Sequence, residues 1–288
     1  MDAEHQRAEP DDLNGQSGVE VTPEQALGAV RAGFPFPHYT DHNTGAYLNV
    51  ASTVMRYLRR GSAILDFGCG PADKTAVLSL LGYRCTGYDD LMDEWYERNG
   101  NRDRIFEFAR SVGIDYVVAR PGPLPFAPRS FDMVMAQDVL EHLHNSPRQI
   151  VNDLIELLRD GGYLFVTVPN AANIRKRIDL LRGRTNLSNF RFYYWMPDPW
   201  RGHVREYVRD DLTQLCAYSG LSHTELRSCH HMVNKKRWPW IARRTYEAAT
   251  LLFPGWRDTW LLVAQKPIGW RRNEQAPSDE ELAAIYTH

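Results

Sequence analysis

The sequence predicts an α/β fold: a doubly wound, mostly parallel seven-stranded sheet with a helical, aromatic-rich insertion. Strand-like and helix-like stretches alternate along the chain, a turn with two glycines follows the first strand, and an acidic pair follows the second. With 288 residues and 43% hydrophobic content, the chain can bury one large core.

The seven expected strands are 63–66, 84–88, 114–118, 131–136, 163–168, 224–228 and 259–265. The fourth is apolar except for Asp132, as in a central strand. Helices are expected at 46–58, 74–81 and 149–158 from their apolar periodicity. We expect Asp160-Gly161-Gly162 to cap the last of these helices.

The organisation predicted is a single domain over 21–270 between two tails. Residues 1–20 carry six acids against one arginine and are expected to be disordered. Residues 271–288 form a looser tail with a short helical end, and 170–205 form an insertion after the fifth strand.

Charge and cysteine content indicate which partners and which cellular compartment to expect. A formal charge of −2 gives no global field for nucleic acid, so no nucleic-acid partner is expected. We find neither a transmembrane run nor the apolar core of a signal peptide. Four scattered cysteines without metal or framework spacing predict a reduced, cytoplasmic protein, and the oligomeric state is left open.

A cofactor site is expected where the first two strands end. Gly68 and Gly70 let the backbone approach a ligand, Asp66 ends its strand, and Asp89 is placed to accept both ribose hydroxyls. Asp73 stands where the dinucleotide fingerprint needs its third glycine, and a carboxylate there would repel a pyrophosphate. S-adenosylmethionine, which has no phosphate, therefore fits better than NAD, although an isolated G-x-G is more often a tight turn.

Further motifs follow in order: Leu124-Pro125-Phe126, Ser130-Phe131-Asp132, Val139-Leu140-Glu141-His142 and Gly202-His203-Val204-Arg205-Glu206-Tyr207. With the glycine turn, they resemble class I S-adenosylmethionine-dependent methyltransferases, especially the bacterial small-molecule branch. The resemblance covers roughly 39–220. It implies a Rossmann-like class I fold and S-adenosyl-L-methionine as cofactor. The cofactor residues that it implies are Asp66, Gly68, Gly70, Asp89, Asp90, Ala136 and Gln137, with Tyr39 covering the site.

One position departs from the family pattern. Many relatives carry an Asp four residues before the Leu of Leu124-Pro125-Phe126, where it holds the adenine amino group. Here that position is Arg120, which cannot accept a hydrogen bond. The adenine is therefore held by backbone or sits differently.

Methyl transfer from a sulfonium is an in-line displacement, so the enzyme positions the nucleophile and removes its proton. For a hydroxyl acceptor the base is expected among His142, His144 and His203, or Asp138 polarises the nucleophile. His142 could instead orient its loop. A divalent ion on His142, His144 and Asp138 is a less favoured alternative, and no metal is expected.

The insertion combines basic and aromatic side chains. Eight Lys or Arg stand there against two acids, with six aromatic residues between 190 and 200. These suit a small-molecule, carbohydrate or anionic acceptor, although a solvated helix packed on the domain would use the same residues. The stretch 235–240 could make a weak membrane-surface contact, and His230-His231 is expected to be a surface pair.

The leading function is O-methylation of a small molecule, sugar or glycan with a histidine general base. The alternatives are a nucleic-acid or protein methylase and a non-catalytic cofactor-binding relative. Neutral charge and the lack of an Asn/Asp-Pro-Pro-Tyr motif weigh against the first alternative, and the intact glycine turn weighs against the second.

Overall fold

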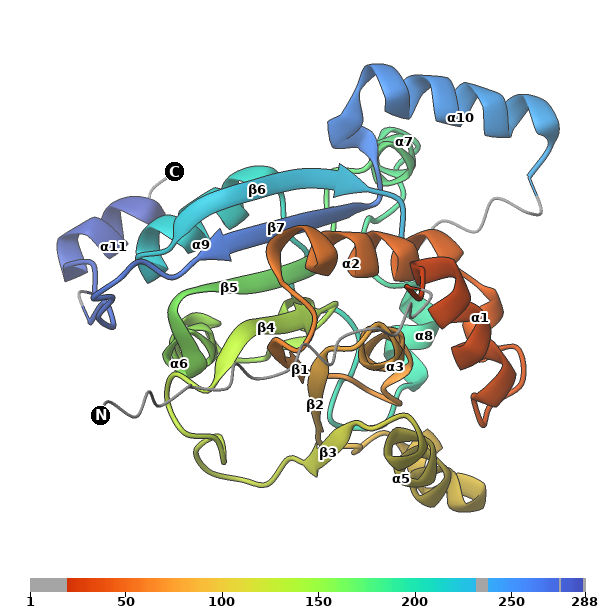
Figure 1. Ribbon diagram of the computed structural model, residues 1–288. Coiled ribbons are helices and arrows are strands. Elements are labelled where there is room, and N and C mark those ends of the chain that lie inside the picture. Colours follow the sequence, from red (N-terminus) through yellow and green to blue (C-terminus); the bar gives the residue numbers. More distant parts are fainter. Residues whose placement is uncertain (1–19, 232–237, 275, 287–288) are drawn as a thin grey trace, which may run out of the picture.

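The computed structural model describes residues 20–231, 238–274 and 276–286. Seven strands form one sheet in the order β3-β2-β1-β4-β5-β7-β6, with β7 antiparallel to both of its neighbours (Figure 1). The strands are β1 Ala63–Phe67, β2 Arg84–Asp89, β3 Asp115–Val118, β4 Phe131–Gln137, β5 Leu158–Pro169, β6 Ser222–Cys229 and β7 Thr259–Gln265. The predicted doubly wound, mostly parallel sheet is confirmed.

Helices cover both faces of this sheet (Figure 1). They are α1 Pro23–Gly33, α2 Thr44–Tyr57, α3 Asp73–Leu80, α4 Glu94–Glu97, α5 Asn101–Ser111, α6 Arg148–Leu157, α7 Ile174–Leu181, α8 Phe190–Trp195, α9 Arg209–Ser219, α10 Trp240–Leu252 and α11 Asp279–Tyr286. The sequence did not predict α1, α5 or α10. The signal for α1 is local, because Thr22 and Gln25 form a capping box around Pro23 at the first turn.

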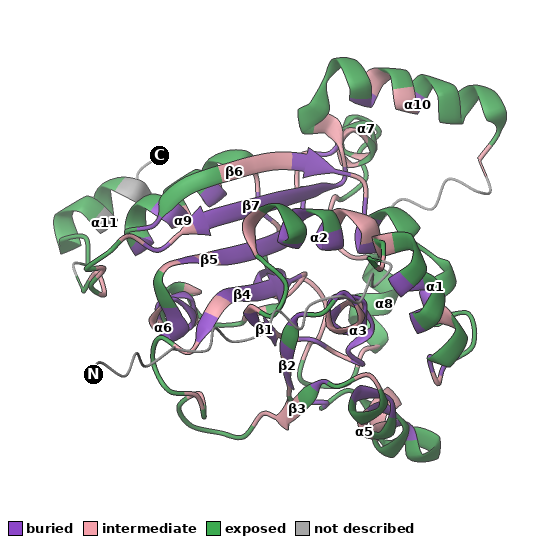
Figure 2. Ribbon diagram, in the orientation of Figure 1, coloured by how far each residue is buried: buried purple, intermediate pink, exposed green. Residues whose placement is uncertain are grey.

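The core has two layers, one on each face of the sheet, and the central strands are mostly buried (Figure 2). Neighbouring residues of one strand point to opposite faces, so Ile64 packs with α1, α2, α3 and α5 while Leu65 packs with α6 and α9. Because both faces are covered there, β1, β4 and β7 are mostly apolar along their length rather than alternating between apolar and polar residues. This double burial fixes the carboxyl ends of β1, β2 and β4 relative to one another.

The predicted cap at Asp160-Gly161-Gly162 is wrong. Helix α6 ends at Leu157, and these residues lie in the first part of β5. The backbone N–H of Gly161 donates to the carbonyl of Lys266 at 2.9 Å. A Cβ on Gly162 would meet the carbonyl oxygens of Arg159 and Asp132 at 2.9 and 3.0 Å. Gly162 is therefore required because two stretches of backbone approach closely there, and it does not cap a helix.

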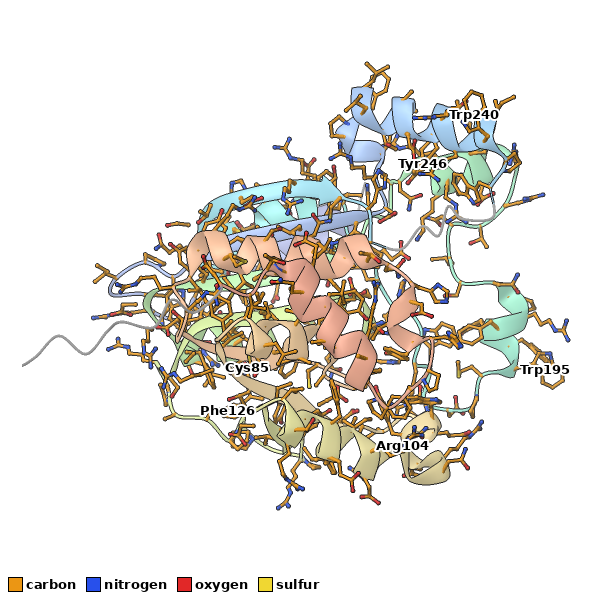
Figure 3. All side chains as sticks on the ribbon, turned by 45° about the vertical axis from the view of Figure 1, so that its right-hand side comes forward. Cys85, Arg104, Phe126, Trp195, Trp240 and Tyr246 are labelled. Atoms are coloured by element: carbon orange, nitrogen blue, oxygen red, sulfur yellow. The ribbon has the colours of Figure 1, made fainter. Side chains whose placement is uncertain are left out.

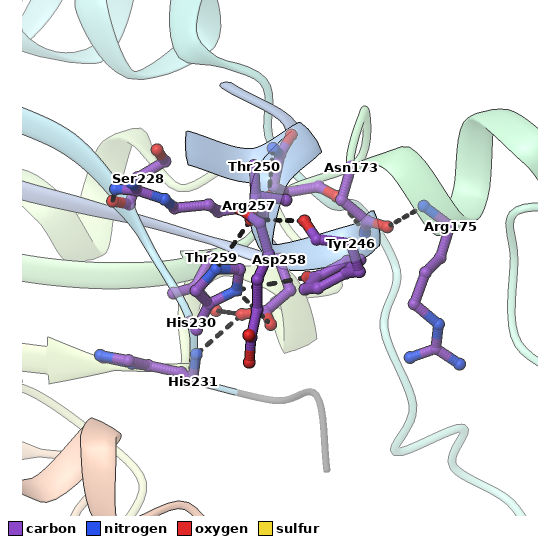
Figure 4. Close-up of polar contacts among 12 residues, drawn as sticks. Asn173, Arg175, Ser228, His230, His231, Tyr246, Thr250, Arg257, Asp258 and Thr259 are labelled. Atoms are coloured by element: carbon purple, nitrogen blue, oxygen red, sulfur yellow. Dashed lines mark hydrogen bonds and ion pairs between the residues drawn. The ribbon is translucent and has the colours of Figure 1, made fainter. Parts of the chain in front are cut away.

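The pair His230-His231 is not the surface pair that was expected. His231 is 3% exposed, and its backbone N–H donates to Asp258 at 2.8 Å, whereas Nδ1 of His230 lies 3.5 Å from the same carboxylate (Figure 4). Tyr246 of α10 also contacts the His230 ring. Asp258 and α10 pack against the pair where β6 ends. His231 is therefore buried, and His230 is partly buried.

The insertion and α10 project beyond the main body of the domain (Figure 1). Trp195 on α8 points away from the domain and is 73% exposed, and Trp240 at the start of α10 is also exposed (Figure 3). The basic half of the 235–240 stretch, Lys235 to Arg237, lies outside the described residues, as do residues 1–19 of the predicted acidic tail. Within the described ranges, no helix combines the length and apolar character needed to span a bilayer.

Candidate active site

A cavity of about 730 Å³ opens at the carboxyl ends of β1, β2 and β4. Its lining is shared between the glycine turn, the two acids after β2, the segment after β4, and the end of the 170–205 insertion. The lining includes Gly68, Gly70, Asp89, Asp90, His142, His144, Trp200 and Arg201. The topology thus brings together the predicted cofactor turn and two of the predicted histidines.

The turn after β1 requires its glycines. Gly68 has φ of +74°, and a Cβ there would lie 2.5 Å from Cγ2 of Val139. Gly70 has φ of +52°, and its carbonyl accepts a hydrogen bond from the Tyr116 hydroxyl at 2.5 Å. Because side chains are excluded, the bare backbone of the turn faces the cavity and can approach a ligand closely.

Asp89 holds this turn while facing the cavity. One carboxylate oxygen accepts from the Gly70 N–H and the other from the Leu91 N–H, both at 2.8 Å. Burial raises the pKa of Asp89 even though these two backbone donors favour the charged form. Each oxygen keeps a further lone pair, so the carboxylate can still accept from a ligand diol. Asp90, beside it, also lines the cavity.

Asp66 lies beneath the turn and not on the cavity wall. It is 2% exposed, and one of its oxygens accepts from the Thr75 hydroxyl at 2.6 Å. Burial raises its pKa to about 7. Asp73, at the third-glycine position, is likewise buried and accepts a hydrogen bond from the Tyr47 hydroxyl. Through these hydrogen bonds, Asp66 connects the end of β1 to α3, and Asp73 connects α3 to α2.

Four other predicted positions lie around the cavity rather than on its lining. Ala136 is fully buried, and Gln137 donates to the Phe165 carbonyl at 3.3 Å. Tyr39 stacks on Trp95 with ring centroids 6.1 Å apart. The Arg120 side chain is exposed, whereas its neighbours Ala119 and Leu124 line the cavity. An adenine placed here would meet apolar side chains and backbone.

The opposite wall presents two histidines held by the insertion. His144 Nε2 donates to the Trp200 carbonyl at 2.6 Å, and His142 Nδ1 donates to the Arg201 carbonyl at 2.9 Å. A carbonyl only accepts, so each bonded nitrogen carries a proton, and in the neutral ring the other nitrogen keeps its lone pair. The insertion therefore fixes the tautomer of both rings, which sequence reasoning did not foresee.

Asp138 has a strong partner that the sequence analysis missed. Its carboxylate lies 2.9 Å from Lys74 Nζ and accepts from the Thr167 hydroxyl at 3.0 Å. Burial alone would raise the pKa of Asp138, but the charge and hydrogen bond of Lys74 outweigh it and hold the pKa below its usual value. The signal for Lys74 was its place in the first turn of the helix after the glycine motif.

Glu141 and His203 lie behind His142. Glu141 is fully buried, and burial together with the charge of Asp138 raises its pKa to about 8. His203 Nδ1 lies 2.8 Å from Glu206 Oε1, and burial followed by the charge of His142 lowers the His203 pKa to about 4. From the sequence, Glu141 was recognised only as part of a motif. Its position next to His142 could have indicated that it belongs to the site.

Comparison with known proteins places this arrangement in a family. Residues 40–226 match the family model described as a methyltransferase domain. The chain belongs to this family. In the solved structure of a SAM-dependent methyltransferase from Methanosarcina mazei, the same fold recurs with a TM-score of 0.52 at 19% identity, over 75% of this chain and 97% of that one. The methyltransferase family and the class I fold predicted from the sequence are confirmed, and the bacterial small-molecule branch stays a prediction.

Two curated relatives are similar over shorter stretches. A ubiquinone biosynthesis O-methyltransferase from Parvibaculum lavamentivorans is 25% identical over 46% of this chain and 49% of its own length. A probable S-adenosylmethionine-dependent methyltransferase from Mycolicibacterium smegmatis is 32% identical over 50% of this chain and 56% of its own length. The chain thus spans about half the length of these relatives.

Proposed function

We propose that this protein transfers the methyl group of S-adenosyl-L-methionine to a hydroxyl oxygen of a small-molecule acceptor, with His144 as general base. The observation that carries the proposal is the single cavity that joins the glycine turn and Asp89 to His142 and His144. In such a cavity the sulfonium and the acceptor oxygen can be held in line, which is the main requirement of the reaction.

The cofactor half of the proposal rests on Gly68, Gly70 and Asp89. The backbone of the turn faces the cavity, and the Asp89 carboxylate has acceptor capacity left for the ribose hydroxyls. Ala136, Gln137 and Tyr39 complete the cofactor set as it was expected from the sequence. Asp66 supports it from below, through Thr75 and α3.

The acceptor half rests on the insertion, which we propose as a lid. Trp200 and Arg201 line the cavity, and Tyr193 packs edge-on against Trp200 with ring centroids 4.9 Å apart. An indole and a guanidinium favour an aromatic or sugar acceptor. The name of the Parvibaculum relative, an O-methyltransferase, supports oxygen over nitrogen as the target.

His144 suits the base role because its Nδ1 keeps a lone pair and the ring lines the cavity. The ring of His142 lies instead beside Glu141 and His203. Asp138 is already paired with Lys74, so it contributes charge to the site and is a weaker acceptor of a proton.

The test is transfer of a labelled methyl group from S-adenosylmethionine to a panel of catechols, phenols and sugars. His144→Ala should lower kcat about a hundredfold or more while leaving cofactor affinity unchanged. His223→Ala, on the exposed part of β6, is the matched control and should behave as wild type. Wild-type turnover in His144→Ala would exclude His144 as the base. RNA, DNA and protein are offered in parallel assays. If only one of these were labelled, the proposed small-molecule acceptor would be wrong.

We further propose a reducing compartment such as the cytoplasm. Cys69, Cys85, Cys216 and Cys229 are all unpaired and buried. Fractionation of the native host, followed by detection of the protein, tests this placement.

A further inference from the structure

Glu141 lies in the short helical turn Leu140–His142 after β4, and its carboxylate is buried. It is 0% exposed, and among the described residues neither carboxylate oxygen has a hydrogen-bonding partner. Buried carboxylates are almost always paired, hydrogen-bonded or bound to a metal, because an uncompensated one is costly. The surroundings of Glu141 should therefore supply a proton or a cation.

Two imidazoles lie against this carboxylate. Glu141, His142 and His203 each offer one ligand atom within 4.8 Å of the other two, and the two rings meet edge to face with centroids 4.9 Å apart. His142 Nδ1 donates to the Arg201 carbonyl and His203 Nδ1 to the Glu206 carboxylate. In a neutral imidazole each Nε2 then keeps its lone pair. When Glu141 is ionised, its carboxylate and the two rings are all potential metal ligands.

We propose that Glu141, His142 and His203 bind a divalent transition-metal ion of the Zn²⁺ or Mn²⁺ class. Neutral imidazole with carboxylate is a donor set that such ions prefer. Three protein ligands leave a position open for an oxygen, as in catalytic metal sites. Bonds of about 2.1 Å require ligand atoms about 3.4 Å apart, so small inward rotations of the side chains complete the site.

The outer contacts of the three ligands have the form that metal sites use. Histidine ligands commonly donate their other N–H to a carboxylate or a backbone carbonyl, which fixes the ring and raises its basicity. Here His203 has Glu206, which is itself paired with Lys176, and His142 has the Arg201 carbonyl. This set differs from the His142, His144 and Asp138 combination considered from sequence, because Asp138 is paired with Lys74.

The role of the ion rests on the proposed function. His142 lines the cavity, so the open coordination position faces the acceptor. A hydroxyl bound to a divalent ion is more acidic, and an acceptor with two neighbouring oxygens, a catechol or vicinal diol, can chelate it. The hydroxyl proton passes to His144. The oxygen then forms its bond to the methyl carbon as the S–CH₃ bond breaks, and that electron pair stays on sulfur.

The test uses the full chain after treatment with EDTA and removal of the chelator. Titration with Zn²⁺ or Mn²⁺ in a calorimeter should show one equivalent per chain, and bound metal should raise the unfolding midpoint by several degrees. Glu141→Gln and His203→Gln should each weaken binding at least tenfold. The matched control is His38→Gln, because His38 makes the same i,i+3 contact with Asp41 but is 85% exposed. It should bind as wild type does.

The outcomes separate this site from the proposed function. Wild-type protein that binds no metal, or metal binding unchanged in Glu141→Gln and His203→Gln, overturns the site while methyl transfer can still occur. Metal binding without transfer to any hydroxyl acceptor supports the site and contradicts the proposed function. A midpoint in EDTA close to that of wild type verifies that each variant folds.

Discussion

At the residue scale, the buried acids under the cofactor turn decide how the protein responds to pH. One oxygen of Asp66 is bonded to Thr75, and the other has no hydrogen-bonding partner within the part of the chain that the structure describes. Burial raises the pKa of Asp66 from 3.8 to about 7. A raised carboxyl pKa means that the folded state holds the proton more tightly than the unfolded chain. The stability from this group is therefore complete below about pH 4 and is lost as the pH rises towards 7.

Asp66→Asn should remove that pH dependence. Relative to wild type, the variant should gain on the order of 2–4 kcal/mol of unfolding free energy between pH 4 and pH 7.5. Urea unfolding of both proteins at the two pH values, without cofactor, measures the change. An unpartnered amide adds a constant cost, so only the pH-dependent difference is the readout. Equal pH slopes in the two proteins would contradict the burial of a titrating Asp66.

Residue-level prediction from the sequence succeeded where the chemistry is local. Gly68 and Gly70 were predicted because a turn after a strand with close backbone approach excludes side chains. The partners of Asp138 and Glu141 could not be predicted. Lys74 and His203 reach them from segments 64 and 62 residues away, and only the packing of β4 against the turn and the insertion brings them together.

At the element scale, the glycine turn is held by its neighbours. Gly68 has a positive φ, and the side chain of Val139 occupies the space that a Cβ at this position would need. Gly68→Ala should therefore cost more than the roughly 1–2 kcal/mol of a left-handed alanine, and it should weaken S-adenosylmethionine binding. Gly61→Ala separates the two costs, because Gly61 has φ of +80° with nothing within 4 Å of a Cβ. Equal destabilisation of the two variants in urea would show that Val139 does not constrain the turn.

The insertion divides into a part that faces the cavity and a part that does not. Trp200 lines the cavity, and its carbonyl holds His144. Trp200→Ala should raise KM for the acceptor about tenfold or more, with little change in cofactor affinity, because it removes an aromatic wall. Trp195→Ala is the control from the same segment, since Trp195 is 73% exposed. A KM that responds equally to both changes would remove Trp200 from the acceptor site.

Prediction of elements was accurate for the strands and incomplete for the helices. Strand 259–265 has the predicted bounds because its apolar run is uninterrupted. The helices α5 and α10 carry many charged or exposed side chains, and the sequence analysis did not assign them. The glycines after α6 indicated a helix cap, but the paired backbone of β4 and β5 requires them instead.

At the scale of the whole molecule, the strand order carries the site. β1 lies between β2 and β4, so the turn after β1, the acids after β2 and the histidines after β4 meet at one edge. A seven-stranded sheet of this kind could be predicted from the alternating pattern. The fold alone does not establish the reaction, which depends on the side chains that line the cavity.

Methyl transfer by this protein requires that the cavity beside Asp89 binds S-adenosylmethionine. Calorimetric titration of wild type and Asp89→Ala with this cofactor, and with NAD as the competing dinucleotide, measures it most directly. We expect one equivalent of S-adenosylmethionine per chain, no NAD binding, and a loss of about 1–3 kcal/mol in Asp89→Ala from the missing charged hydrogen bonds. Binding of NAD in place of S-adenosylmethionine, or unchanged affinity in Asp89→Ala, would contradict the account.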